Sequence, residues 1–143
     1  MKIVVALDKF KGSLTAPVAC EFVARELPEH AVIVKPMADG GDGTLDAIHA
    51  VLGGEWITCE VTGPLPTMRR SAMYLWLPHE RQAFIEMARA SGLVLLDPAQ
   101  RNPLLTTTYG TGELLADAVQ RGAKHIWLTI GGSATNDGGV GAA

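Results

Sequence analysis

The sequence predicts an α/β protein: a Rossmann-like, mostly parallel sheet flanked by helices, with an antiparallel extension. Apolar runs at residues 3–7, 32–34 and 126–130 each lead into a loop rich in glycine and in acidic or hydroxyl side chains. Helical periodicity separates the first two runs, and alternating polarity marks the middle of the chain. If the three runs are parallel strands of one sheet, their loops meet at its carboxyl edge, where open α/β sheets bind ligands.

Helices are expected after the first two runs. Thr15 is placed to cap the first helix, Pro17 suits its first turn, and apolar residues recur at helical spacing until Pro28 closes it. Thr44 is placed to cap the second helix, which residues 53–54 (Gly-Gly) end.

The middle of the chain predicts the antiparallel extension. Residues 57–62 alternate between apolar and polar, and residues 71–77 and 82–88 give two more strands joined by a turn at 78–81. Glu86 interrupts the last of these strands, either as a buried carboxylate or at a solvent-facing position. A third helix is expected to begin at residue 111 or 112 and to end at Gly122 before the strand 126–130.

Length and composition fit one domain over residues 1–143. The chain has 143 residues, 48% of them hydrophobic, which suffices for a core. With 12 Lys and Arg against 15 Asp and Glu, the net charge of −3 predicts no nucleic-acid or anionic-membrane surface. No apolar run approaches the ~20 residues of a membrane helix. Cys20 and Cys59 stand outside any zinc-binding pattern, which favours two thiols in a cytoplasmic protein.

The three loops carry the side chains suited to phosphate and metal chemistry. The first joins Asp8 to two lysines, a pattern that suits phosphoryl transfer because cations neutralise developing charge. The second, residues 39–44 (DGGDGT), offers glycines for close backbone approach, two carboxylates and a helix N-terminus. A charged surface turn and a tight strand-to-helix turn are the structural alternatives for these two loops.

The third loop, residues 131–139 (GGSATNDGG), is the strongest signal. It places four glycines, two hydroxyls, an amide and a carboxylate within nine residues behind an apolar strand. It matches neither the Walker pattern nor the Rossmann glycine pattern, and neither occurs elsewhere in the chain. The sequence therefore argues against an ordinary P-loop or dinucleotide-binding fold.

Five segments resemble the bacterial glycerate kinase family, in the same order along the chain: residues 8–14, 38–44, 84–88, 110–113 and 131–139. The resemblance covers the whole chain, and its last segment is highly specific. It implies a Rossmann-like fold with a second domain, and transfer of the γ-phosphate of ATP to D-glycerate with Mg²⁺. Lys9 and Asp42 depart from the family pattern, where serine and glutamate are commoner, but both keep the polar character.

The roles that follow from this resemblance are hypotheses. The catalytic candidates are Asp8, Lys11, Asp39 and Asp137. The candidates for binding glycerate or phosphate are Gly40, Gly41, Asp42, Gly131, Gly132, Ser133, Thr135 and Asn136. Asp39 and Asp42 are also the candidates for holding Mg²⁺. Asp8 or Asp137 is expected to orient the metal or the attacking hydroxyl, and Lys11 to neutralise the transferring charge.

Family members are considerably longer, so residues 1–143 are expected to be the N-terminal part of a two-domain glycerate kinase. The strand 126–130 would then be poorly covered, because the third loop ends where a covering helix would normally begin. Two alternatives to an active kinase stay open: a non-catalytic module that binds a sugar acid or phosphate, and an inert fragment that self-associates through the uncovered strand. A homodimer is compatible with the family reading.

Overall fold

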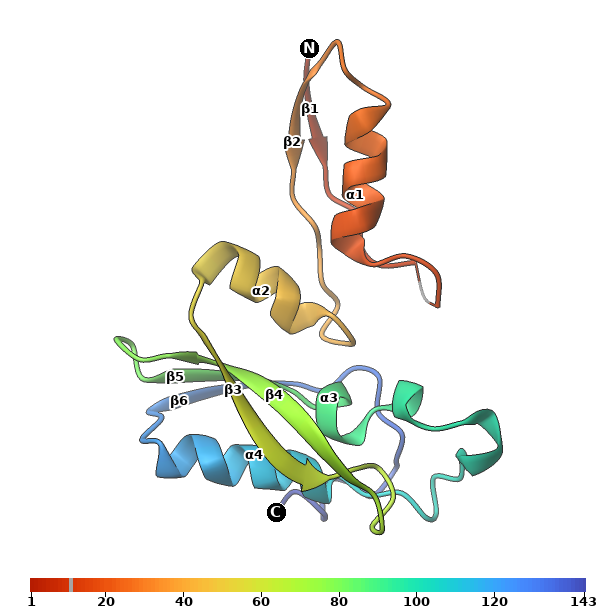
Figure 1. Ribbon diagram of the computed structural model, residues 1–143, viewed down its shortest axis with the longest axis vertical. Helices are drawn as coiled ribbons and strands as arrows, with labels where there is room; N and C mark the ends of the chain where they lie inside the picture. The colour runs from red at the N-terminus through yellow and green to blue at the C-terminus, as the bar shows by residue number, and fades with distance from the viewer. Residues whose placement is uncertain (11) are drawn as a thin grey trace.

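The computed structural model describes residues 1–10 and 12–143 and shows a mixed α/β protein built around two separate sheets. The first sheet holds two parallel strands, β1 (Lys2–Val5) and β2 (Ala31–Val34), connected through helix α1 (Ala16–Arg25). These three elements stand apart from the rest of the chain (Figure 1). The predicted first helix and its flanking strands are thus present.

The second sheet contains four strands in the order β3-β4-β5-β6. Their bounds are Glu55–Thr62 for β3, Arg69–Leu77 for β4, Gln82–Glu86 for β5 and His125–Thr129 for β6. The first three are antiparallel neighbours, which confirms the predicted antiparallel extension, and β6 adds in parallel to β5. Arg81 takes a φ of 52° in the turn that joins β4 to β5.

One prediction about this topology is wrong: the three apolar runs do not share a sheet. The third run, β6, pairs with β5, with Ile126 beside Ala83 and Leu128 beside Ile85, while β1 and β2 pair only with each other among the described strands. The alternating strands of the middle segment supply the parallel neighbour that β6 needs. Apolar pattern alone identified each strand but could not choose its partner.

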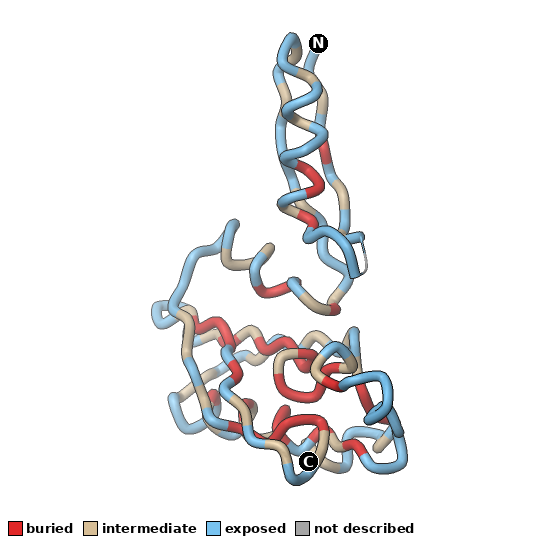
Figure 2. Tube along the Cα trace, turned by 45° about the vertical axis from the view of Figure 1, so that its right-hand side comes forward, coloured by how far each residue is buried: buried red, intermediate tan, exposed pale blue. Residues whose placement is uncertain are grey.

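The core lies between the four-stranded sheet and helix α4 (Tyr109–Gln120). Tyr74, Ile85 and Leu114 are fully buried there, and red, buried segments of the trace concentrate in this part of the molecule (Figure 2). The short helix α3 (Ala88–Ser91) and two 3₁₀ turns, η1 (Leu93–Leu95) and η2 (Pro98–Gln100), connect β5 to α4.

Helix α2 (Thr44–Leu52) links the two parts of the molecule. It lies between the β1–α1–β2 unit and the four-stranded sheet (Figure 1), and it packs on β4 and β5 through the fully buried Leu45. Both cysteines are free: Cys20 is buried on α1 and Cys59 is partly buried on β3. No helix among the described residues is long and apolar enough to cross a lipid bilayer.

Candidate functional site

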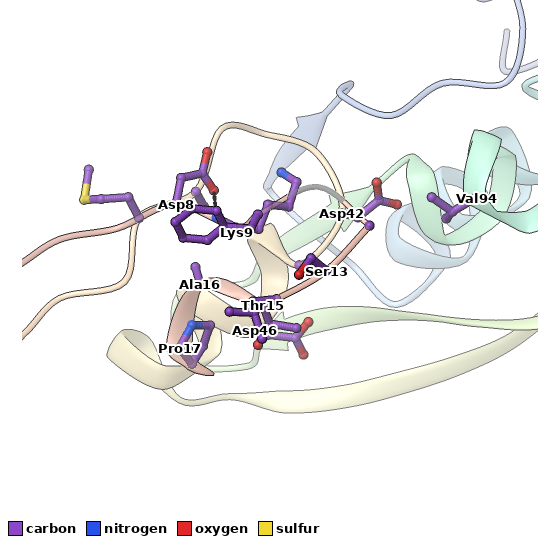
Figure 3. A pocket seen from close by; sticks show the side chains of 15 residues that line it. Asp8, Lys9, Ser13, Thr15, Ala16, Pro17, Asp42, Asp46 and Val94 are labelled. Carbon is purple, nitrogen blue, oxygen red and sulfur yellow. Dashed lines mark hydrogen bonds between the residues drawn. The ribbon is translucent and has the colours of Figure 1, made fainter. Parts of the chain in front are cut away.

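The first two loops enclose a cavity of about 560 Å³ at the junction between α1 and α2. Its polar lining comes from two segments of the chain (Figure 3): Asp8, Lys9, Ser13 and Thr15 from the first loop, and Asp42 and Asp46 from the second loop and α2. Phe10, Leu14, Met37 and Val94 add an apolar wall. Loops that are thirty residues apart in the sequence therefore face one another across a single hollow.

An ion pair between Lys9 and Asp39 ties the first loop to the second. The Lys9 Nζ lies 2.5 Å from the Asp39 Oδ1, and the same oxygen accepts a hydrogen bond from the Gly41 N–H at 2.8 Å. The hydrogen bond from Lys9 holds the pKa of Asp39 below its ordinary value, and the same bond raises the pKa of Lys9. Asp39 is therefore an anion and Lys9 a cation throughout the neutral pH range.

The second loop also touches the third, although their strands belong to different sheets. The Gly131 N–H donates to the Gly40 carbonyl at 2.9 Å. A Cβ on Gly131 would lie 2.7 Å from the Cα and the nitrogen of Gly41, a distance that real Cβ atoms do not reach. Glycine at these positions lets the backbones of the second and third loops approach each other. The sequence had instead suggested that these glycines allow a phosphate to approach the backbone.

The N-terminus of α2 is occupied by a side chain of the protein itself. Glu86, at the end of β5, is 2% exposed, and its two carboxylate oxygens accept the N–H groups of Gly43 at 3.2 Å and Leu45 at 3.0 Å. The Thr44 N–H donates to the Gly41 carbonyl at 3.1 Å. The structure thus selects the buried alternative for Glu86, and three of the N–H groups expected to be available for an anion already have partners.

The hydroxyls of the third loop hold that loop in place. Ser133 Oγ donates to the Thr135 carbonyl at 3.0 Å, and Thr135 Oγ1 donates to the Thr106 carbonyl at 2.9 Å. Asn136 is exposed. Of the described residues that line the cavity, none comes from residues 131–139.

Asp137 serves the same loop by anchoring it to the start of α4. Its Oδ2 accepts both the N–H and the hydroxyl of Thr108 at 2.8 Å, and further bonds come from the N–H groups of Gly139 at 3.0 Å and Gly141 at 3.3 Å. Burial by itself would raise the pKa of Asp137, but these donors outweigh it and leave the pKa below its ordinary value. Both carboxylate oxygens of Asp137 thus have partners inside the protein.

A comparison with known proteins gives the family. The model of the glycerate kinase family matches residues 3–143. The chain belongs to this family. It is 53% identical over 141 residues to an uncharacterised Synechocystis protein, 46% identical over 145 residues to the glycerate kinase of Bacillus cereus, and 45% identical over 145 residues to the glycerate 2-kinase of Escherichia coli.

These glycerate kinase relatives are much longer than the chain. The matches cover 98–99% of the chain but 38% of each of these three relatives. The crystal structure of a putative glycerate kinase 2 from Salmonella typhimurium superposes with a TM-score of 0.74 at 49% identity, covering 99% of this chain and 39% of that one. The fold described above therefore corresponds to a little over a third of those proteins.

Against this family background, the structure groups the predicted residues unequally. Asp8 and Asp42 line the cavity. Asp39 pairs with the lining residue Lys9, and the neighbouring Gly40 accepts the N–H of Gly131. Lys11, predicted to neutralise the transferring charge, lies outside the described residues. The first two glycines of the third loop lie beside the second loop: Gly131 meets Gly41, and a Cβ on Gly132 would lie 3.0 Å from the Asp42 carboxylate.

Three further residues at or beside the site were not among the predicted site residues. Lys9 was counted as one of the two cations of the first loop but was given no role of its own, Asp46 was given no role at the site, and Glu86 was left undecided between a buried and a solvent-facing position. The position of Glu86 inside an apolar strand was the sequence signal that it could be a buried carboxylate. No signal in the sequence shows that Lys9 meets Asp39, because that contact needs the positions of two loops.

The charges of the cavity limit what it can bind. Its described lining carries three carboxylates, on Asp8, Asp42 and Asp46, against one ammonium on Lys9. Within the described part of the chain, no three His, Cys, Asp or Glu side chains lie close enough to share a metal ion. Mg²⁺, however, is commonly held by one or two carboxylates together with substrate phosphates. The carboxylates that line this cavity fit that mode of binding.

Proposed function

We propose that this chain forms the N-terminal part of a glycerate kinase, which transfers the γ-phosphoryl group of ATP to a hydroxyl of D-glycerate. The supporting observation is the meeting of the first two family loops around one cavity, joined by the Lys9–Asp39 pair. The hydroxyl oxygen forms a bond to the γ-phosphorus, the bond from that phosphorus to the β-phosphate oxygen breaks, and the products are phosphoglycerate, ADP and the hydroxyl proton. ATP use, D-glycerate as the acceptor, a cytoplasmic location and a homodimer come to this chain from the family and stay predictions.

The cavity residues suit three tasks in this reaction. Lys9 supplies a fixed positive charge beside the loop where an anionic group would sit. Asp8 and Asp42 are carboxylates on the cavity wall, able to accept the proton that the attacking hydroxyl loses. Asp39 orients Lys9 through the ion pair and would hold a metal only after releasing it.

Mg²⁺ would be held by Asp42, together with the phosphates of the nucleotide. The Asp42 carboxylate has no hydrogen-bond partner among the described residues, in contrast to Asp39 and Asp137. The metal would supply charge neutralisation to the phosphoryl group and would offset the excess of carboxylates in the cavity.

The experiment that tests this function is ³¹P NMR of ATP, MgCl₂ and D-glycerate with the chain alone and with the chain joined to the remaining portion of a full-length relative. A new phosphomonoester signal that requires D-glycerate is expected from the joined protein. Asp39→Asn and Asp42→Asn should lower its turnover by about a hundredfold or more, the usual contribution of a positioned acid or base. Glu60→Gln, an exposed change on β3, should leave it unchanged.

A second candidate function is a non-catalytic module that binds a sugar acid or phosphate. The observation that favours it is that the third-loop hydroxyls already have partners in the fold: Ser133 Oγ donates to the Thr135 carbonyl, and Thr135 Oγ1 donates to the Thr106 carbonyl. Calorimetry with D-glycerate and with inorganic phosphate separates the two candidates. Binding by the folded chain without turnover in the joined protein would support the module and overturn the kinase.

A further inference from the structure

Among the described residues, Glu86 is the one buried carboxylate that the proposed chemistry does not use. It ends β5 in the middle of the four-stranded sheet and projects toward the face covered by α2, on the opposite side from α4. Burial of an anion is costly unless hydrogen bonds and a counter-charge satisfy it. A glutamate kept at this position must therefore be held by specific partners.

Its two hydrogen-bond donors are backbone N–H groups at the start of α2. The two oxygens accept one N–H each from Gly43 and Leu45, so the carboxylate spans the first turn as a cap that comes from a distant strand. Gly43 has a φ of 87°, a conformation in which glycine is favoured. The cap thus fixes both the direction of the helix and the backbone geometry of the residue next to Asp42.

Arg89 adds a second tie between the same elements. Its Nε lies 3.7 Å from the Glu86 Oε1, and its Nη2 lies 2.7 Å from the Asp46 Oδ2. The guanidinium also lies over the Trp56 ring, 5.0 Å from the ring centre. One arginine therefore neutralises the buried glutamate and holds the side chain of a cavity carboxylate.

We infer that Glu86 is the positioning residue of the cavity: with Arg89 it fixes the first turn of α2 on the four-stranded sheet and so places Asp42 and Asp46 on the cavity wall. The inference rests on the proposed function for its catalytic consequence, but the placement of the loop can be measured without any activity. Glu86 contacts backbone and Arg89, not the cavity itself, so it acts through Asp42 and Asp46.

The test compares Glu86→Gln with a matched change at Glu113. Glu113 also accepts a backbone N–H, that of Thr62, and also pairs with an arginine, Arg69, but it lies on α4 away from the cavity. Hydrogen exchange of the 143-residue chain, read at single amides by NMR, is the measurement. In Glu86→Gln the amides of Gly43 and Leu45 should exchange about tenfold to a hundredfold faster, the loss expected for a hydrogen bond to a charged group.

The pattern over the chain distinguishes positioning from a general loss of stability. We expect faster exchange confined to residues 39–46 in Glu86→Gln, a larger effect in Glu86→Ala, which keeps no acceptor oxygen, and no change in residues 39–46 in Glu113→Gln. A uniform rise over all strands, or unchanged exchange at Gly43 and Leu45, would overturn the inference. If the glutamate variants do not fold, Arg89→Met is the substitute, because it removes the ion pair with Asp46. It should give faster exchange confined to residues 39–46, and unchanged exchange at these residues would overturn the inference.

Kinetics add the catalytic consequence. In the chain joined to the remaining portion of a relative, Glu86→Gln should lower kcat/KM for D-glycerate by about a hundredfold, as expected for misplaced catalytic groups, and Glu113→Gln of equal stability should not. If the unmodified joined protein forms no phosphoglycerate, the proposed function fails while the exchange pattern still decides the role of Glu86. A normal kcat/KM in Glu86→Gln would show that the placement has no role in turnover.

Discussion

Lys9 and Asp39 show how single residues join segments that are distant in the sequence. The Asp39 side chain of this pair is 55% exposed and that of Lys9 is 20% exposed, so water screens the pair and its contribution to stability is small. Its effect is on charge and geometry: the carboxylate stays ionised and the ammonium stays beside the second loop. The pair therefore matters for the site more than for folding.

Replacing Lys9 should change the titration of Asp39 in a defined direction. In Lys9→Met the main cause of the lowered pKa is lost, so the pKa of Asp39 should rise toward its ordinary value. Carboxyl ¹³C shifts followed by NMR from neutral pH downward measure this, with Lys2→Met on β1 as the control. An unchanged titration of Asp39 in Lys9→Met would show that the pair does not form in solution.

Gly131 makes a second residue-scale prediction, because its missing side chain permits the contact between the second and third loops. Gly131→Ala places a methyl group 2.7 Å from the Gly41 backbone and should cost about 1–3 kcal/mol, the range for overpacking. Urea unfolding measures the loss. Exchange of the residue-131 amide, which donates to Gly40, should accelerate as well.

Gly138→Ala is the control for that prediction. It adds the same methyl group to the same loop at a φ of 65°, where no other atom lies within 4 Å. Its cost is conformational, about 1–2 kcal/mol, and the amide of Gly131 should keep its protection. Equal exchange of that amide in both variants would contradict a tight contact between the loops.

At the scale of elements, two helices begin on carboxylates supplied from elsewhere in the chain. Glu86 on β5 caps α2, and Asp137 in the third loop bonds Thr108 just before α4. Thr15 and Thr44, the residues expected to cap α1 and α2, make no side-chain cap. Long-range caps of this kind fix the relative positions of elements, which a local cap does not do.

Asp137→Asn should therefore lower the free energy of unfolding and make it depend less on pH in the acid range. The folded-state pKa of Asp137 is lowered, so its contribution is fully present above the unfolded pKa and is lost as the pH falls through the folded one. We expect a loss of about 1–3 kcal/mol at neutral pH and a smaller loss once the pH falls below the lowered pKa of Asp137. Urea unfolding at several pH values measures it, with the exposed Glu55→Gln as control, and equal losses at all pH values would contradict this assignment.

At the scale of the whole molecule, the chain is well packed at one end and open at the other. The β1–α1–β2 unit leaves Val4 at 61% and Phe22 at 55% exposed, and β6 leaves Trp127 at 56% exposed. Parallel strands are normally covered on both faces, and two-stranded sheets are marginal by themselves. We therefore expect the free energy of local unfolding to be lowest in the elements that carry these exposed faces.

Hydrogen exchange should follow this division. Amides of β1 and β2 should exchange well before those of β4 and β5, because the latter belong to the buried core against α4. Mass spectrometry of peptic peptides measures the order. Equal protection of the two sheets would contradict a weakly held N-terminal unit.

The exposed apolar residues should also make the chain self-associate as its concentration rises. Sedimentation velocity over a concentration series is the measurement. Val4→Lys and Ile130→Lys, at exposed positions, should reduce the association, because charge opposes pairing of edge strands. Thr58→Lys on the polar edge strand β3 is the control, and a monomer at every concentration would refute the expectation.

The sequence by itself determined the class of the fold, the place of each strand and of the three longer helices α1, α2 and α4 to within a few residues, and the family. These follow from local patterns: apolar periodicity, turn residues and motifs that lie within a few positions of one another. The tertiary structure alone decided that β6 pairs with β5, that Lys9 meets Asp39, and that Glu86 rather than a bound anion occupies the start of α2. Strand pairing and buried charge contacts depend on the relative free energies of many alternative contacts between distant segments. Short-range sequence patterns do not show which of these contacts is the most stable.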